Sequence, residues 1–227
     1  MTATKKDIRV GKTHVAEFGS KAMATRDSLK VSAVRLINLD GFSNVRVEDV
    51  TRDAGVAKGL FYRYFSSIND ITRVVSEELF ERVLADARAR PFNAGMEPTY
   101  EWLYDYVFVT VEKFVHNRGL LACMFELHGS FPEISQAWQS AAHDWNLHLA
   151  AFVERASGMS ADEARDYCYI LGAAMEGILY QAAVRNTPDL RKIGESAKSI
   201  TDTILQLWYR SIFLKATPER PSQRGPF

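Results

Sequence analysis

The sequence predicts an all-α fold, with an N-terminal three-helix domain built around a helix-turn-helix and a larger C-terminal helical domain. Apolar residues recur at helical spacing from about residue 26 to residue 214, and the apolar–polar alternation of strands is nearly absent. With 227 residues, 47% of them hydrophobic, the chain can bury a sizeable core. Glycine, proline and capping residues divide the helical pattern into nine expected helices.

The first four helices are predicted from an apolar face and from end signals. Their expected ranges are 26–39, 47–54, 58–64 and about 68–90. Leu29, Ala33 and Ile37 share one face of the first helix. Ser67 and Asp70 form a capping box at the start of the fourth helix, which ends before Pro91.

Five further helices are expected after a linker over residues 91–97. Their ranges are about 98–116, 119–128, 132–157, 161–185 and 190–214. Gly158 ends the third of them, and Ser160 with Glu163 forms a capping box for the fourth.

The composition argues against a membrane protein, a metalloprotein and an enzyme. The chain has no run of 18 apolar residues and no secretory signal at its polar, basic start, so a cytoplasmic protein is expected. The five histidines lack metal-ligand spacing, and Cys123 and Cys168 are expected to be buried apolar residues. No nucleophile elbow or phosphate loop occurs, so we expect no catalytic residue, metal or cofactor.

The charge is distributed unevenly along a chain whose net charge is zero. Residues 1–71 carry 12 basic and 8 acidic side chains, a net charge of +4, and residues 72–227 carry 16 and 20, a net charge of −4. A basic front and an acidic body suit a protein whose first domain meets phosphate, although an excess of this size is common.

Residues 47–64 have the pattern of a helix-turn-helix. Ala54 is small where two helices must pack, and Gly55 can adopt the positive φ that ends the first helix. A DNA-contacting set is expected on the outer face and at the start of the motif: Arg46, Ala57, Lys58, Gly59, Leu60, Tyr62, Arg63 and Tyr64. Lys, Arg and Tyr side chains on a short helix suit a major groove and its phosphates. The alternative is a plain helical hairpin with solvated charges.

Several segments together resemble the DNA-binding domain of the TetR family of bacterial repressors. They are Gly41-Phe42, Val47-Glu48-Asp49-Val50, Ala54 through Phe65 and Asp70-Ile71. The resemblance covers about 45 residues. It implies a homodimer that binds double-stranded operator DNA at two half-sites, and a cavity in the larger domain for an effector that controls DNA affinity.

With this resemblance the chain divides into four parts. They are a basic, partly disordered N-terminal extension (1–25), a helix-turn-helix DNA-binding domain (26–71), a helical ligand-binding and dimerisation domain (72–214) and a flexible tail (215–227).

Four positions depart from the family pattern. Arg46 stands where Thr or Ser usually caps the helix, and Ala57, Leu60 and Ile68 replace Ser, Thr and Lys. Because each lost phosphate contact removes about one unit of salt slope, we expect weaker general DNA affinity or help from the basic extension. Leu60 can instead pack on a thymine methyl group.

The aromatic-rich second half predicts a pocket for an apolar or aromatic effector. Our candidates for its lining are Trp102, Tyr106, Phe125, His128, Trp138, Trp145, Met175, Glu176 and Leu179, with Asn146 and Gln181 as further polar candidates. Pockets between helices are usual ligand sites, but aromatic residues at helical spacing are more often ordinary core.

Small and apolar residues near the C-terminus predict a dimer interface made by the last two helices. The candidates are Gly172, Gly177, Ile204, Trp208 and Ile212. An ordinary core pair is the alternative. The expected function is a ligand-released repressor. An activator of the same fold, and a module that binds a small molecule or a partner without binding DNA, remain alternatives.

Overall fold

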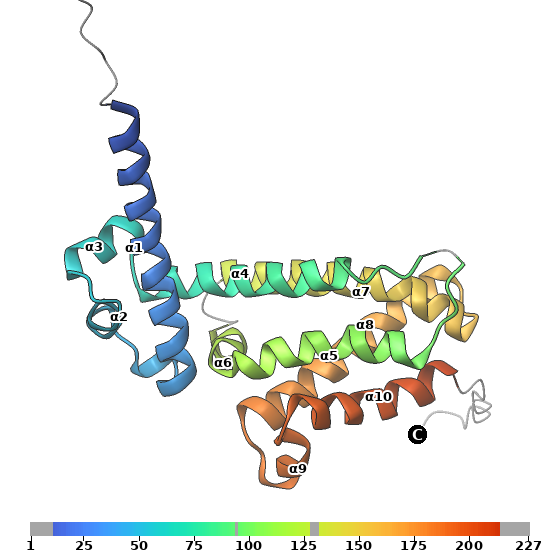
Figure 1. The fold of residues 1–227 in the computed structure, drawn as a ribbon. Coiled ribbons are helices and arrows are strands. Elements are labelled where there is room, and N and C mark those ends of the chain that lie inside the picture. Colours follow the sequence, from blue (N-terminus) through green and yellow to red (C-terminus); the bar gives the residue numbers. More distant parts are fainter. Residues whose placement is uncertain (1–10, 94, 128–131, 214–227) are drawn as a thin grey trace, which may run out of the picture.

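The computed structural model describes residues 11–93, 95–127 and 132–213, and its regular elements within those ranges are all helical, which confirms the predicted fold class. The α-helices are α1 (Gly11–Asp40), α2 (Val47–Asp53), α3 (Lys58–Tyr64), α4 (Ile68–Arg88), α5 (Tyr100–His116), α6 (Arg118–Leu127), α7 (Pro132–Ser157), α8 (Ala161–Ile178), α9 (Arg191–Gly194) and α10 (Ala197–Phe213). Helices α1, α2 and α3 form a head, and α4 leads from this head into a body of long helices (Figure 1).

Helix α1 begins at Gly11, so the expected start at residue 26 is wrong. The segment from Gly11 to Asp40 has no proline and contains several Ala, Lys and Leu residues, which favour helix. Its N-terminal part projects beyond the head, where an exposed helix needs no apolar stripe and gives no periodic signal (Figure 1). The predicted stop holds, because Gly41 adopts a positive φ of 78°. Residues 1–10 and 214–227 lie outside the described residues.

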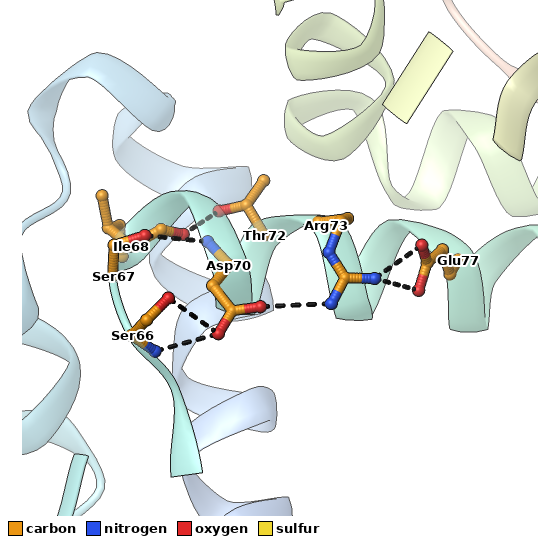
Figure 2. Close-up of polar contacts among 7 residues, drawn as sticks. All are labelled: Ser66, Ser67, Ile68, Asp70, Thr72, Arg73 and Glu77. Carbon is orange, nitrogen blue, oxygen red and sulfur yellow. Dashed lines mark hydrogen bonds and ion pairs between the residues drawn. The ribbon is translucent and has the colours of Figure 1, made fainter. Parts of the chain in front are cut away.

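The start of α4 is held by side-chain oxygens that bind free backbone amides (Figure 2). The Ser67 hydroxyl accepts a hydrogen bond from the Asp70 amide at 3.2 Å, and the Asp70 carboxylate accepts one from the Ser66 amide at 2.9 Å. This carboxylate also accepts a hydrogen bond from Arg73, which pairs in turn with Glu77. The pKa of Asp70 is lowered, mainly by the hydrogen bond from the Ser66 amide and further by Arg73.

Expected helices in the last third of the chain are divided differently. Helix α8 passes into a π-helical turn, Leu179–Val184, and the expected helix over 190–214 is split into α9 and α10. Gly194 sits so close to the preceding helix that a Cβ would lie 2.5 Å from the Ala182 carbonyl oxygen. The Ser196 hydroxyl accepts a hydrogen bond from the Ser199 amide at 3.1 Å and marks a new helix start.

A continuous apolar core runs from the head into the body. Leu29, Ile37 and Phe61 are fully buried in the head, and Leu103 and Phe152 are fully buried in the body. An ion pair between Lys30 of α1 and Glu78 of α4, at 2.8 Å, adds a polar link between head and body. The head is therefore held against α4 by apolar packing and by this ion pair, and α4 continues along the body.

Candidate nucleic-acid interface and ligand cavity

Helix α3 is anchored on one face and open on the other. Phe61 has no exposed surface and Phe65 is 2% exposed, so these rings hold the helix against the head core. Gly55, at φ 66°, makes the turn that brings α3 across α2. The predicted contact residues on the open side are exposed: Arg46, Ala57, Lys58, Gly59, Tyr62 and Arg63. Leu60 is half-buried, and so is Tyr64, which packs against the core.

Ion pairs limit the positive charge that the head presents. Lys58 forms an ion pair with Glu48 of α2, which raises the pKa of Lys58 and lowers that of Glu48. Arg52 pairs with Asp49 at 3.2 Å. No ion pair involves Arg46 or Arg63 within the described part of the chain. These two guanidinium groups are therefore the free cations flanking the open face of α3.

Arg46 replaces the expected hydroxyl at the start of α2 without capping it. Its side chain makes no capping hydrogen bond, whereas the Asp49 carboxylate reaches back to the Arg46 amide at 3.1 Å. The hydrogen bond from the N-cap amide to the Asp49 carboxylate is therefore kept. The N-cap hydroxyl that usually accepts the other hydrogen bond of a capping box is replaced by the Arg46 guanidinium group.

An apolar cavity lies between α4, α5, α7 and α8. Five of the predicted residues line it: Trp138, Trp145, Asn146, Met175 and Glu176. Phe125 lines an adjoining hollow that also contains Trp138 and Glu176. Phe80, Val83 and Leu84 of α4 and Phe114 of α5 complete the apolar wall, and sequence reasoning missed them.

The other predicted pocket residues lie elsewhere. Trp102 stacks on Tyr106 and on Phe152, with ring centroids 5.0 and 4.9 Å apart, so it packs against the core and does not line the cavity. Tyr106 is 2% exposed and its hydroxyl donates to the Trp145 carbonyl at 3.0 Å. Leu179 is fully buried outside the cavity lining. His128 lies outside the described residues.

Few polar groups enter the cavity. The Trp145 indole donates to the Thr110 hydroxyl at 3.0 Å, and both groups are thereby satisfied. Asn146 is 4% exposed, and its Oδ1 accepts no hydrogen bond from the described residues. Burial raises the pKa of Glu176, and a hydrogen bond from the Trp138 side chain opposes that change.

Most of the residues predicted for the dimer interface are buried by contacts within one chain. Ile204 and Trp208 are fully buried and Ile212 is 2% exposed. Gly172 lies against Asn146 of α7, where a Cβ would be 2.9 Å from the amide oxygen. Of the predicted set, Gly177 is the exposed residue. The apolar side chains that α8 and α10 turn outward are Tyr169, Ile170, Leu207 and Tyr209.

Two further observations concern membrane-spanning helices and metal-binding groups. Among the described residues, no helix combines the length and apolar character needed to cross a membrane. The same residues hold no group of three or more His, Cys, Asp or Glu side chains placed to bind a metal ion. A helix-turn-helix head on an α-helical body with a cavity defines the chain as an HTH-type transcriptional regulator.

Comparison with known proteins agrees with this class. Residues 31–75, from the middle of α1 into α4, match the sequence model described as bacterial regulatory proteins, tetR family. The HTH-type transcriptional regulator EthR of Mycolicibacterium smegmatis is 23% identical over 194 residues, 82% of this chain and 85% of that relative. The uncharacterized HTH-type regulator YvdT of Bacillus subtilis is 32% identical over 126 residues, 55% of this chain and 63% of YvdT, so that match spans less than two thirds of the relative.

Solved structures share the fold at low sequence identity. The fatty acid degradation regulator FadR from Bacillus halodurans superposes with a TM-score of 0.62 and 18% identity, covering 81% of this chain and 93% of FadR. The TetR-family regulator PfmR from Thermus thermophilus superposes with a TM-score of 0.59 and 18% identity, covering 79% of this chain and 97% of PfmR. Over residues 31–75 the chain is therefore similar to the tetR family of bacterial regulatory proteins, and its whole fold is similar to those of solved regulators.

Proposed function

We propose that this protein is a homodimeric repressor that binds a pseudo-palindromic operator and leaves it when an apolar or aromatic effector fills the body cavity. The observation that carries the proposal is α3, which is anchored by buried Phe61 and leaves Tyr62 and Arg63 exposed. A short helix held in this way can enter a major groove, and two copies about 34–36 Å apart read successive half-sites.

The charge around α3 supports contacts to phosphate as well as to bases. Arg46 and Arg63 flank the open face and carry no ion pair within the described residues, so they are free to meet the DNA backbone. Lys58 must exchange Glu48 for a phosphate, which reduces what this residue adds to affinity. Leu60 and Ala57 offer methyl groups that suit thymine.

The cavity supports control by an effector through α4. Phe80, Val83 and Leu84 of this helix line the cavity, and Glu78 of the same helix is paired with Lys30 in the head. An effector that fits one position of α4 better than another shifts the balance between the two positions, and operator affinity changes by the same differential free energy.

The outward faces of α8 and α10 support a dimer. Ile170 is 64% exposed and Leu207 is 49% exposed, and Tyr169 and Tyr209 on the same two helices are also exposed. Paired with a second copy, two helices from each subunit form a four-helix interface. The side chains assigned to the interface therefore differ from those that the sequence predicted, while the two helices are the same.

A second candidate function is a module that binds a small molecule or a partner protein without reading DNA. The Lys58–Glu48 pair and the apolar residues at 57, 60 and 68 favour it, because they remove phosphate contacts from the head. An activator of the same fold would bind DNA as the repressor does and differ only in its effect on transcription.

Selection of genomic fragments by the purified full-length protein separates these functions. An enriched pseudo-palindrome is the expected result for either regulator, and promoter fusions then distinguish repression from activation. Arg63→Ala should abolish the enrichment, whereas Arg82→Ala, which removes an exposed Arg from α4, should keep it. Absence of any enriched sequence with the unaltered protein would overturn the proposal in favour of the binding module.

A further inference from the structure

Trp138 and Glu176 stand where three hollows of the body meet. The apolar cavity lies on one side of them. A hollow bounded by Met124 and Phe125, and a more open one bounded by His143 and Tyr169, share the same two residues. The Glu176 side chain therefore lines both the open hollow and the cavity.

The polar groups at this junction are mainly hydrogen-bond acceptors, and no cationic side chain of the described residues pairs with them. Glu176 has no ion pair within the described residues, and no Lys, Arg or His is among the described residues that line the inner cavity. Asn146, which lines both the cavity and the open hollow, has an Oδ1 with no hydrogen-bond donor. The nearby ring of His143 already contacts the Tyr169 hydroxyl. Among the described residues, Glu176 is half-buried and accepts a hydrogen bond only from the Trp138 side chain, so a cation beside this carboxylate and a donor for the Asn146 oxygen would both be favourable.

The same place is surrounded by aromatic rings. The Trp138 ring centroid lies 5.4 Å from that of Phe80, 5.6 Å from that of Phe114 and 6.2 Å from that of Phe125. Indole and phenyl faces attract a desolvated cation, and their edges pack well against another aromatic ring. The wall therefore suits an aromatic body, whereas the carboxylate suits a positively charged end.

We propose that the effector is a protonated aromatic amine, whose ammonium group binds Glu176 and Asn146 at the mouth of the cavity while its ring lies among Trp138, Phe80 and Phe114. This inference rests on the proposed function, because it assigns chemistry to the effector cavity. It also excludes a class of ligand. An aromatic carboxylate would bring a second negative charge to Glu176 and would find no cation among the described residues of the inner cavity.

Three probes that share the naphthalene ring and differ in charge test the assignment: 1-naphthylmethylamine (a cation), 1-naphthylmethanol (neutral) and 1-naphthaleneacetate (an anion). Titration calorimetry with the full-length protein at pH 7 should show the amine binding at least tenfold more tightly than the alcohol, and the carboxylate binding most weakly. Glu176→Gln should bring the amine to the affinity of the alcohol and leave the alcohol unchanged, which also shows that the cavity is intact. Glu154→Gln, an exposed glutamate elsewhere on α7, should change neither affinity.

The outcomes separate this inference from the proposed function. If the alcohol or the carboxylate binds as tightly as the amine, or if Glu176→Gln leaves the amine affinity unchanged, the amine assignment is overturned and the effector cavity stands. If none of the three probes binds, both the assignment and the cavity as an effector site are overturned. Release of selected operator DNA by the amine, lost in Glu176→Gln, would support both.

Discussion

The backbone amide of Gly119, near the start of α6, donates a hydrogen bond of 2.8 Å to the Asn38 side-chain oxygen near the end of α1. These residues are 81 positions apart in the chain and belong to the body and the head, respectively. The contact is close, since a Cβ at Gly119 would fall against the Ile37 carbonyl oxygen and lie 2.6 Å from the Asn38 Cα. Helix α6 thus meets the head directly, in addition to the path through α4.

Gly119→Ala is expected to destabilise the protein and to alter its DNA affinity. The added methyl group meets backbone rather than a movable side chain, so α6 must shift away from α1 at a cost of about 1–3 kcal/mol. Urea unfolding measures the loss of stability, and titration with selected operator DNA measures the change in affinity. Gly19→Ala, on exposed α1 with nothing within 4 Å, should be neutral or stabilising. Equal stability of the two variants would contradict the close approach of α6.

Glu48→Gln is expected to tighten binding to DNA. The change removes the carboxylate that pairs with Lys58, so the ammonium group becomes available to a phosphate and the salt slope steepens by about one unit. Fluorescence anisotropy with operator DNA at several salt concentrations measures both quantities. Glu81→Gln on α4 removes the same charge from an exposed site away from α3. If Glu81→Gln raises the affinity as much as Glu48→Gln, net charge and not the ion pair is responsible.

Ile170→Asp is expected to convert the proposed dimer into a monomer without unfolding the chain. The side chain is 64% exposed in one protomer, so a charge there is tolerated by the fold but becomes unpaired in an apolar interface. Light scattering after gel filtration at micromolar concentration measures the mass. Val31→Asp provides the control, because Val31 is 67% exposed on α1. A dimer that survives Ile170→Asp would place the interface elsewhere.

Both cysteines are expected to resist alkylation in the native protein. Burial raises the pKa of Cys123 and of Cys168 to about 12 each. Because a raised pKa keeps a thiol protonated, only a very small fraction is thiolate at pH 8, and the sulfur atoms are also covered. Iodoacetamide labelling followed by mass spectrometry should find no label on the native protein and two labels in urea. Rapid labelling of either native cysteine would show that its helix opens readily.

The head could be predicted from the sequence because its signals are local. The ends of α2 and α3 were expected within one residue, since Gly55, the charged first turn of α2 and the spacing of Phe61 and Phe65 act over a few positions. The early start of α1 was missed because an exposed helix carries no apolar stripe. The split before α10 was missed because Gly194 is fixed by the distant Ala182 carbonyl.

The cavity could be predicted only in part, because its lining depends on how helices face one another. Trp102 and Trp138 are both tryptophans at helical spacing, but one stacks in the core on Phe152 and the other lines the cavity. Phe80 and Phe114 have the same pattern as core residues and were passed over. The contact between Asn38 and Gly119 has no local signal, since it joins segments that only the folded chain brings together.

The geometry of α4 between Glu78 and Phe80 also limits how its sequence can change in length. Glu78 pairs with Lys30 of the head and Phe80 lines the cavity, and two residues correspond to about 200° of rotation and about 3 Å of rise. Head and cavity therefore lie on opposite sides of a single turn, separated by about one helix diameter. Substitution at Phe80 can change the shape of the cavity without disturbing the contact between the head and α4. An inserted or deleted residue would turn the two sides about 100° out of phase, so this helix tolerates changes of side chain far better than changes of length.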